Sequence, residues 1–496
     1  MDGETLTRRS LLRTVGVGGV AAAALPAFAQ AGPAISWSAG PATSGLPAPD
    51  PLVHLVNRIT FGVCPRDLAR AQELGYEGFI EEQLQPEGID DSAVEAEVRA
   101  RFPTVFMSRR AIETQERLHV VAELKAATVY RAVFSRRQLF EMMVDFWSNH
   151  FNIHHLDGPA AYFKTFEDRE VIRRHAFGRF RELLGASAKS PAMIIYLDNF
   201  SNLKSSPNEN YGRELMELHT IGVESGFTQM DVEEVARAFT GWTLIKPVGL
   251  RSQRNKFLFN PAQHDDGERM VLGTHIPAGL GIGHGERVLD LLAGHPSCAR
   301  LIATKLCRRF VSDQPPPLLV DRAAATFTAT GGDIREVTRT ILLSEEFRAS
   351  ADQKLKRPLE VVVSALRALE ARVSAEGMET LLSVLFRMGQ LPFDWPPPDG
   401  YPDVAAAWGN TNGMLDRWDF ALALGWNHLP GVEAEVEELT GGLRRPDRLA
   451  DHLAERLLAR RLDAADRQQV IRYLTNGGSV MGAVSLILGS PYFQWR

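Results

Sequence analysis

The sequence predicts a large all-α protein that forms a single multi-helix domain, with a division into two lobes left open. Three observations support this fold class. Most segments after residue 50 repeat apolar residues at helical spacing, and the strand-like segments are too few for an alternating α/β fold. The composition, 45% hydrophobic and 23% charged, is that of an ordinary globular chain. No long, low-complexity linker divides the chain after residue 50.

The first half of the chain shows a series of helical patterns. The first pattern covers 67–84 and is interrupted at Gly75, and the next two cover 111–135 and 138–151. A pattern over 169–189 follows. A helix over about 208–220 begins after Pro207 and ends before Gly222, as the preferences of proline and glycine favour. The next helix covers 228–240.

An irregular insertion around 244–285 interrupts the helices. It is rich in Gly, Pro and His, and it predicts a short strand pair around 257–259 and 271–272. Residues 394–403 form a second loop, because their prolines forbid helix. Helical patterns cover the rest of the second half: 286–294, 298–313, 320–330, 334–344, 355–372, 378–388, 412–427, 446–460, 463–475 and 479–489.

The N-terminus reads as an export signal. The run Thr7-Arg8-Arg9-Ser10-Leu11-Leu12-Arg13 resembles the twin-arginine signature, and an apolar stretch and small-residue cleavage sites follow it. We therefore predict a twin-arginine signal peptide over 1–31, a flexible leader over 32–50 and the helical domain over 51–496. The twin-arginine export machinery would be a partner, and the protein would be periplasmic or secreted. A short membrane anchor is the alternative, but the apolar run is shorter than the ~20 residues of a bilayer span.

The charge and the cysteine content argue against a nucleic-acid-binding protein and against a zinc finger. A formal charge of −6 does not favour a nucleic-acid partner. The cysteines Cys64, Cys298 and Cys307 have no zinc-finger spacing, so we expect buried thiols, with a bridge between the last two left open. No later segment is apolar and long enough to span a membrane, so none is expected in the mature protein.

The run from Pro207 to Val223 carries the densest group of chemically active side chains. On a helical wheel its polar residues share one stripe, whereas His219 points to the opposite side. Arg213 lies four residues from both Glu209 and Glu217 and can pair with either carboxylate. Glu214 and Glu217 are neighbours one turn apart, and such carboxylates repel unless a proton or a cation lies between them. The alternative is that the stripe has a structural role only, as a solvated helix face with salt bridges.

Other segments supply candidate partners for this stripe. Polar loop residues and helix-borne histidines are the main candidates. For catalysis we predict Glu214, Glu217, Asp198 and His150. For substrate binding we predict Asn149, Asn208, Glu209, Asn210, Arg213, Trp242 and Tyr401. For a divalent metal, the one cofactor considered, we predict His264 and Asp265.

Several segments together resemble the DUF1800 family, bacterial proteins of unknown function. The matching segments are 54–62, 146–151, 191–199, 207–223, 228–242, 264–267, 272–273 and 389–403. The resemblance implies export and a mostly helical fold, but no reaction. It also implies a companion protein, from a second exported family related to sulfatases and phosphatases.

Three functions are consistent with these observations. The first is a hydrolase that cleaves a polysaccharide or another envelope polymer by carboxylate acid–base chemistry. The second is a metal-dependent periplasmic enzyme with His, Glu and Asp ligands. The third is a non-catalytic exported scaffold or binding protein, in which the polar stripe is an internal network.

Overall fold

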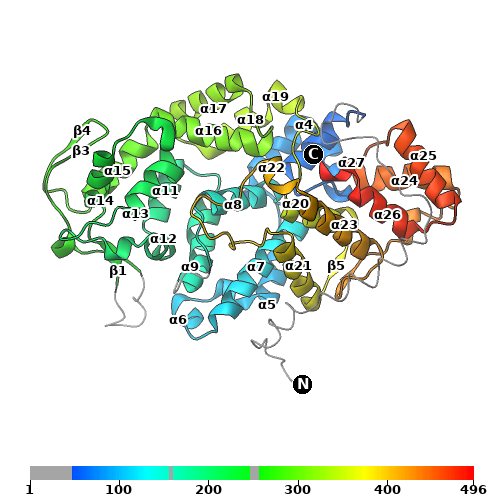
Figure 1. Cartoon of the computed structure of the whole chain (residues 1–496), viewed down its shortest axis with the longest axis horizontal. Coiled ribbons are helices and arrows are strands. Elements are labelled where there is room, and N and C mark those ends of the chain that lie inside the picture. Colours follow the sequence, from blue (N-terminus) through cyan, green and yellow to red (C-terminus); the bar gives the residue numbers. More distant parts are fainter. Residues whose placement is uncertain (1–46, 156–159, 246–255) are drawn as a thin grey trace.

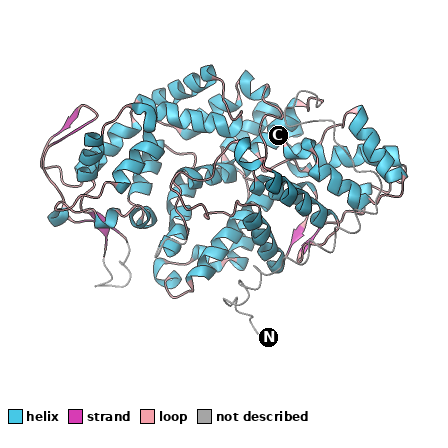
Figure 2. Ribbon diagram, in the orientation of Figure 1, coloured by secondary structure: helices cyan, strands magenta, loops and turns pink. Residues whose placement is uncertain are grey.

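A computed structural model of the chain describes residues 47–155, 160–245 and 256–496. The predicted signal peptide, and the leader up to residue 46, lie outside the described residues. The all-α prediction is confirmed, since within these ranges helices form nearly all of the regular structure and the strands are short (Figures 1 and 2).

In the first half of the chain, α3, α4 and α7 pack against α8. In chain order the α-helices are α3 (Pro51–Ile59), α4 (Pro65–Leu84), α5 (Ser92–Arg101), α6 (Arg109–Ile112), α7 (Arg117–Phe134), α8 (Gln138–His150), α9 (Ala160–Phe166), α10 (Arg173–His175), α11 (Phe180–Ala188), α12 (Pro191–Tyr196), α13 (Asn210–Glu214) and α14 (Gln229–Ala238). Two π-helical turns extend α9 and α13: η4 (Glu167–Ile172) and η6 (Leu215–Thr220).

The second half continues with helices up to the last residues. They are α15 (Gly283–Ala293), α16 (Pro296–Phe310), α17 (Pro317–Ala329), α18 (Ile334–Leu342), α19 (Glu345–Arg348), α20 (Pro358–Ala368), α21 (Ala375–Arg387), α22 (Ala405–Trp408), α23 (Thr411–Gly425), α24 (Pro446–Leu458), α25 (Ala464–Thr475), α26 (Val480–Gly489) and α27 (Pro491–Gln494). Short 3₁₀ turns connect several helices: η2 (Pro86–Gly88), η3 (Pro103–Phe106), η5 (Asn199–Ser201), η7 (Val223–Ser225), η9 (Pro261–Gln263) and η10 (Glu438–Thr440).

The described residues also form three short antiparallel strand pairs between the helices. β1 (Trp242–Leu244) pairs with β2 (Phe257–Phe259), β3 (Arg269–Val271) with β4 (Thr274–Ile276), and β5 (Arg372–Val373) with β6 (Val432–Glu433). The predicted strands at 257–259 and 271–272 therefore exist, but their predicted pairing with each other is wrong. The second segment pairs instead with β4, from which a two-residue turn separates it, as hairpin formation favours, and the first pairs with β1, which precedes it in the chain.

One hydrophobic core connects the helices along the elongated molecule. Every residue of α20 is buried, and this helix packs against α7, α21, α23 and α24. Figure 1 shows α14, α15 and the β3–β4 hairpin at one end, α24 to α26 at the other, and α8 and α20 between them. The three cysteines are free and buried. Cys298 and Cys307 lie nine residues apart on α16, about 13.5 Å along its axis, too far for a bridge.

Tertiary contacts move several helix ends from their predicted places. The predicted 169–189 helix is split between α10 and α11, because Gly178 and Phe180 bond instead to the segment before α18. Phe180 N donates to Gly332 O at 2.8 Å, and Ile334 N donates to Gly178 O at 3.0 Å. The predicted 111–135 helix is likewise divided into α6 and α7. By contrast, the break at Gly75 is confirmed, with φ of +73° inside α4.

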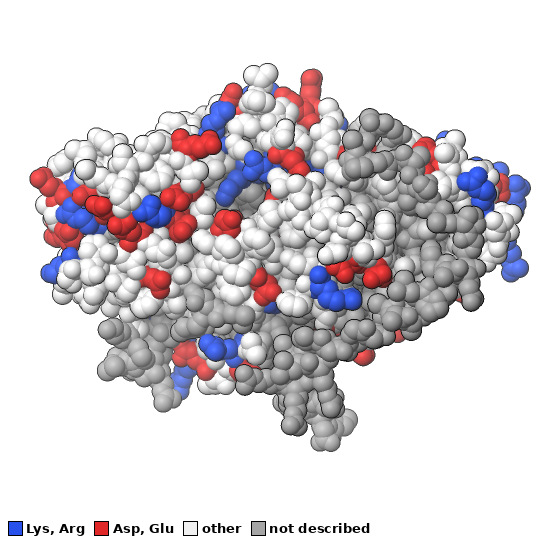
Figure 3. Space-filling model, viewed as in Figure 1, with Lys and Arg blue, Asp and Glu red and all other residues white. Residues whose placement is uncertain are grey.

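The surface matches the modest net charge. Figure 3 shows acidic and basic side chains interspersed over the visible face, most densely at the end that carries α14 and α15. This view shows no broad basic face of the kind that binds nucleic acid. Among the described residues, none of the helices combines the length and the apolar character that crossing a bilayer requires.

Candidate functional site

The polar stripe of the Pro207–Val223 run lies on α13 and η6. Arg213 Nη2 donates to Glu209 Oε2 at 3.0 Å, and Arg213 Nη1 lies 3.6 Å from Glu217 Oε1. Both of the predicted four-residue pairs therefore form. All three side chains are partly exposed, so each pair contributes at most a few tenths of a kcal/mol to stability. The stripe is thus a surface feature that is open to a ligand.

Two asparagines hold the start of this helix. Asn208 Oδ1 accepts from Asn210 N at 2.9 Å, and Asn208 N donates to Asn202 Oδ1 at 2.9 Å. Asn208 Nδ2 donates to Ser201 Oγ at 3.2 Å. These bonds satisfy backbone groups that a helix start leaves open. Asn208, predicted as a substrate contact, therefore serves the local fold in this structure, and Asn210 is exposed.

Glu214 differs from the other carboxylates of the stripe. Burial raises its pKa, and the negative charges of Glu217 and Asp399 raise it further, while Arg213 opposes the shift. Asp399 belongs to the proline-rich loop, 185 residues away in sequence. A carboxyl group with a raised pKa holds its proton to a higher pH than an ordinary carboxyl group and is better suited to donate it. The helix formed by α13 and η6, called the signature helix below, is therefore electrostatically coupled to that loop.

A cavity of about 250 Å³ lies between α8, α16 and the 395–403 loop. Phe146, Asn149 and His150 line it from α8, and Lys305, Arg308 and Arg309 line it from α16. Arg357 contributes from the start of α20. The loop contributes the remaining residues: Trp395, Asp399, Gly400, Tyr401, Pro402 and Asp403. The cavity thus unites three of the predicted site residues, Asn149, His150 and Tyr401.

His150 has a defined tautomer. Its Nε2 lies 3.1 Å from the carbonyl oxygen of His219, which can only accept, so Nε2 carries the hydrogen. Nδ1 is then the acceptor for Lys305 Nζ, at 3.1 Å. Burial, together with the charge of Lys305, holds the pKa of His150 well below its usual range. Both ring nitrogens are engaged inside the protein, so His150 positions Lys305 here.

Lys305 is the cation that this arrangement presents to the cavity. Its Nζ also donates to Leu218 O on η6 at 3.3 Å, which links α16 to the signature run. Burial and the neighbouring charge of Arg308 lower the pKa of Lys305 to about 8, although Asp399 opposes the shift. The ammonium group is therefore charged at neutral pH and close to losing its proton.

An ionic cluster lies next to the cavity and contributes Arg309 and Arg357 to its lining; we call this cluster the floor of the cavity. Glu360 Oε1 accepts from Arg309 Nη1 at 2.5 Å, from Arg496 Nη2 at 2.9 Å and from Arg357 Nη2 at 3.1 Å. Burial alone would raise the pKa of Glu360, but the three guanidinium charges hold it well below its usual range. Asp145 also accepts from Arg357, at 2.6 Å. The cations of the floor are consequently paired with carboxylates, whereas Lys305 and Arg308 form no salt bridge with any residue that the structure describes.

A side-chain clamp fixes the loop over the cavity. Asn149 Nδ2 donates to Tyr401 O, and Tyr401 N donates to Asn149 Oδ1, both at 2.7 Å. Gly400 has φ of +76°, and a Cβ there would lie 2.2 Å from Asn149 O. Only glycine fits at this close approach. The side chain of Asn149 therefore holds the loop by binding the backbone of Tyr401.

Replacing Asn149 with alanine should destabilise the protein by about 2 kcal/mol, because it leaves two backbone groups of Tyr401 without partners. Urea unfolding monitored by fluorescence measures the change. The control is Asn476→Ala, at an exposed helix end, which should stay within about 0.5 kcal/mol of the native protein. Equal losses in both variants would contradict the clamp.

Other predicted residues lie away from the cavity lining. Asp198 is exposed with φ of +59° at the end of α12. Trp242 is fully buried, with Phe239 and Phe257 against its ring, so it packs the core rather than facing a substrate. Asp265 accepts from Arg237 Nε at 2.7 Å. His264 is buried beside His284.

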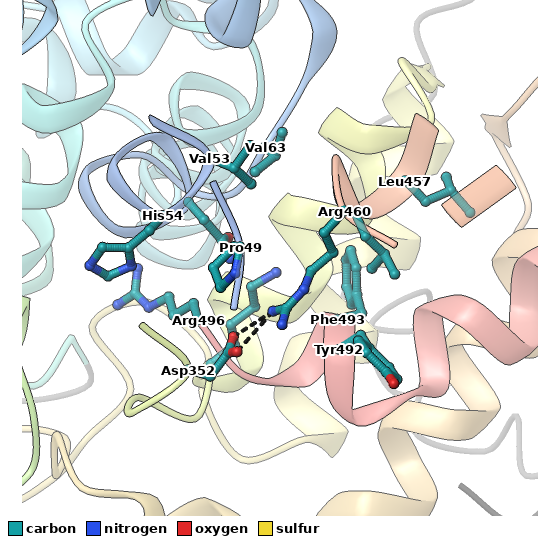
Figure 4. A pocket seen from close by; sticks show the side chains of 13 residues that line it. Pro49, Val53, His54, Val63, Asp352, Leu457, Arg460, Tyr492, Phe493 and Arg496 are labelled. Atoms are coloured by element: carbon teal, nitrogen blue, oxygen red, sulfur yellow. Dashed lines mark hydrogen bonds and ion pairs between the residues drawn. The ribbon is translucent and has the colours of Figure 1, made fainter. Parts of the chain in front are cut away.

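A second, smaller cavity carries no comparable chemistry. It measures about 20 Å³ and is lined by residues of α3, α24 and the C-terminal segment (Figure 4). Both carboxylate oxygens of Asp352 accept from Arg460 Nη1, at 2.7 and 2.9 Å. The cavity has room for about one water molecule. Its charges serve internal packing.

Two groups of side chains in the described ranges could hold a metal ion. One consists of His154, His155 and Asp394, and the other of His264, Asp266 and His284. His155 lies within 3.0 Å of Asp394 and donates or accepts at both ring nitrogens within the protein. His154 does not share a helix face with His150, because α8 ends at His150.

Sequence reasoning missed Lys305, Arg308 and Asp399. Lys305 is a single cation between buried residues of an amphipathic helix, a pattern that looks like an ordinary surface position. Asp399 lies in the proline-rich loop at 394–403, which has the signal of a rigid frame between two aromatic residues. The loop itself could have indicated Asp399 as a site residue, because a rigid loop can present a carboxylate at a fixed place.

Comparison with known proteins identifies a family but no activity. The model of the family described as "Protein of unknown function (DUF1800)" matches residues 54–495. No curated protein and no solved structure matches the chain.

Proposed function

The chain belongs to the DUF1800 family, and we propose that it is an exported hydrolase that cleaves an anionic polysaccharide or another anionic envelope polymer. The main observation is the cavity. Lys305 and Arg308, which form no salt bridge among the described residues, line it together with Asp399, the carboxylate that is coupled to Glu214 of the signature helix. The proposed export rests on the twin-arginine signature at residues 7–13.

The cations favour an anionic substrate. Within the part of the chain that the structure describes, neither Lys305 nor Arg308 forms a salt bridge, and both line the cavity. Arg308 Nε donates only to the carbonyl oxygen of Asp313, at 3.2 Å. A carboxylate, sulfate or phosphate group of a polymer would supply the missing partner.

The carboxylates supply acid–base chemistry. Glu214, whose pKa is raised, donates a proton to the leaving oxygen as the bond between that oxygen and carbon breaks. Asp399 accepts a proton from the attacking water, and Trp395 Nε1 orients it by donating to its Oδ1 at 2.8 Å. The rings of Trp395 and Tyr401, with centroids 5.0 Å apart, offer sugar units a surface for stacking.

The test is polymer cleavage by the purified protein. We expect it to release new reducing ends from at least one acidic polymer in a panel of acidic and neutral envelope polysaccharides. A panel without any release would favour the non-catalytic scaffold. A companion related to sulfatases and phosphatases fits this function, because it would remove the anionic groups from the same polymer.

Binding of the acidic polymer should weaken as pH rises through about 8. Lys305, whose pKa burial lowers to about 8, is charged below that pH and neutral above it, and the lost attraction should raise Kd about tenfold. Titration calorimetry on both sides of pH 8 measures this change. Lys305→Arg keeps its charge and should flatten the profile. The same Kd for the native protein on both sides would contradict the role of Lys305.

A further inference from the structure

A buried pair of histidines lies outside the cavity. His264 follows η9 in the irregular segment, and His284 is in the first turn of α15. His264 Nε2 and His284 Nδ1 lie 2.9 Å apart. Asp266 Oδ1 lies 3.9 Å from the first nitrogen and 3.6 Å from the second. Both imidazole side chains are at most 1% exposed, whereas that of Asp266 is 55% exposed.

The surrounding backbone determines both tautomers. His264 Nδ1 lies 2.8 Å from the carbonyl oxygen of Thr240, and His284 Nε2 lies 2.9 Å from that of Pro277. A carbonyl oxygen only accepts, so each of these nitrogens carries the hydrogen. The two nitrogens that face each other, His264 Nε2 and His284 Nδ1, then carry no hydrogen, and each presents a lone pair to the other. Lone pairs at 2.9 Å repel unless a positively charged species lies between them.

The segment holds these ligands in place. Gly241 has φ of +76°, and a Cβ there would lie 2.5 Å from Asn260 O and 3.2 Å from His264 N, so the close approach of this loop requires glycine. Asp266 Oδ1 accepts from Gly281 N at 2.9 Å. A histidine that donates its second ring nitrogen to a backbone carbonyl is typical of metal ligands, because the bond orients the ring.

We propose that His264 Nε2, His284 Nδ1 and an Asp266 carboxylate oxygen bind one Zn²⁺ ion, with a fourth position open to solvent. Two imidazole nitrogens and a carboxylate form a ligand set that suits Zn²⁺. Tetrahedral bonds of about 2.05 Å place ligand atoms roughly 3.3 Å apart. The rings need to separate by only a few tenths of an ångström. Asp266 thus replaces Asp265, the ligand that the sequence predicted, because Asp265 pairs with Arg237.

The ion would tie the irregular segment to α15. Residues 264 and 266 belong to the loop that connects the β1–β2 and β3–β4 pairs, and residue 284 belongs to the helix. None of the three lines the 250 Å³ cavity. The metal site is consequently independent of the proposed cleavage chemistry, and either one can fail without the other.

Metal content of the full-length, folded protein tests this site. After loading with Zn²⁺ and gel filtration, we expect one equivalent per chain by mass spectrometry in the native protein. His284→Ala and His264→Ala should lose it, and Asp266→Asn should raise the Kd for Zn²⁺ at least tenfold. The matched control is His275→Ala, an exposed histidine of the same segment, which should retain the ion.

Co²⁺ and a chelator provide readouts that do not depend on activity. Co²⁺ in place of Zn²⁺ should give the visible absorption of a tetrahedral site, and a chelator should lower the Tm of the native protein but not that of His264→Ala or His284→Ala, which lack the ion. If His284→Ala does not fold, the Kd of Asp266→Asn for Zn²⁺ still tests the site, because Asp266 is exposed and its substitution does not disturb the core. A native protein without stoichiometric metal, or equal Kd values for native and Asp266→Asn proteins, would overturn the proposal and favour a shared proton.

Discussion

Glu214→Gln should lower the rate of polymer cleavage about 10²–10⁴-fold, the range that general acid catalysis contributes. Glutamine has the shape of glutamate but no proton to donate to the leaving oxygen. The pKa of Glu214 is raised by burial and by the charges of Glu217 and Asp399, which favours the protonated form of the native side chain. Initial rates of reducing-end release measure the effect.

Binding separates this loss from misfolding. The Kd of Glu214→Gln for the polymer should stay within about threefold of the native value, because its isosteric side chain leaves Lys305 and Arg308 in place. Glu224→Gln is the control, since this exposed glutamate follows the signature run, and it should keep the full rate. Glu214→Gln with an undiminished rate would remove this carboxyl group from the mechanism.

The largest stability loss is expected for Glu360→Ala, about 3–5 kcal/mol. The substitution leaves the guanidinium groups of Arg309, Arg357 and Arg496 buried without the carboxylate that compensates them. It also removes the acceptor for Arg357 N, 2.9 Å from Glu360 Oε2, at the start of α20. Chemical denaturation, with the free energy of unfolding extrapolated to water, measures this loss.

A surface glutamate provides the comparison. Glu376→Ala alters an exposed position in the first turn of α21 and should change the free energy of unfolding by about 0.5 kcal/mol or less. A loss below about 1 kcal/mol for Glu360→Ala would show that the cluster is hydrated or rearranges easily, which the short, buried contacts contradict. The floor of the cavity would then not be rigid.

The sequence correctly predicted the contacts between residues that are close together in the chain. Helical spacing placed Glu209, Arg213 and Glu217 in contact, and the helix predicted over 228–240 begins with a capping box of Thr228 and Asp231. The placement of His219 away from the stripe is also correct, since its ring is buried against Phe151. These outcomes depend only on neighbours within one or two turns.

The rest of the site depends on contacts between distant segments. Lys305 approaches the signature helix because α16 packs against η6, and the proline-rich loop is held in place by Asn149 of α8. No periodicity within a segment encodes these contacts. The π-helical turn η6 is a further example. Thr220 Oγ1 donates to Leu215 O at 2.6 Å, and Ile221 N donates to Met216 O at 3.0 Å, a widening that a regular helical wheel does not include.

A matched pair of polymers tests the central claim most directly. The kcat/KM of the purified native protein should be compared on an acidic envelope polysaccharide and on the same polymer after its acidic groups have been converted to neutral ones. We predict cleavage of the acidic form with a kcat/KM at least tenfold higher, because Lys305 and Arg308 bind its charge. Equal values, a preference for the neutral form, or no cleavage of either would contradict the proposal.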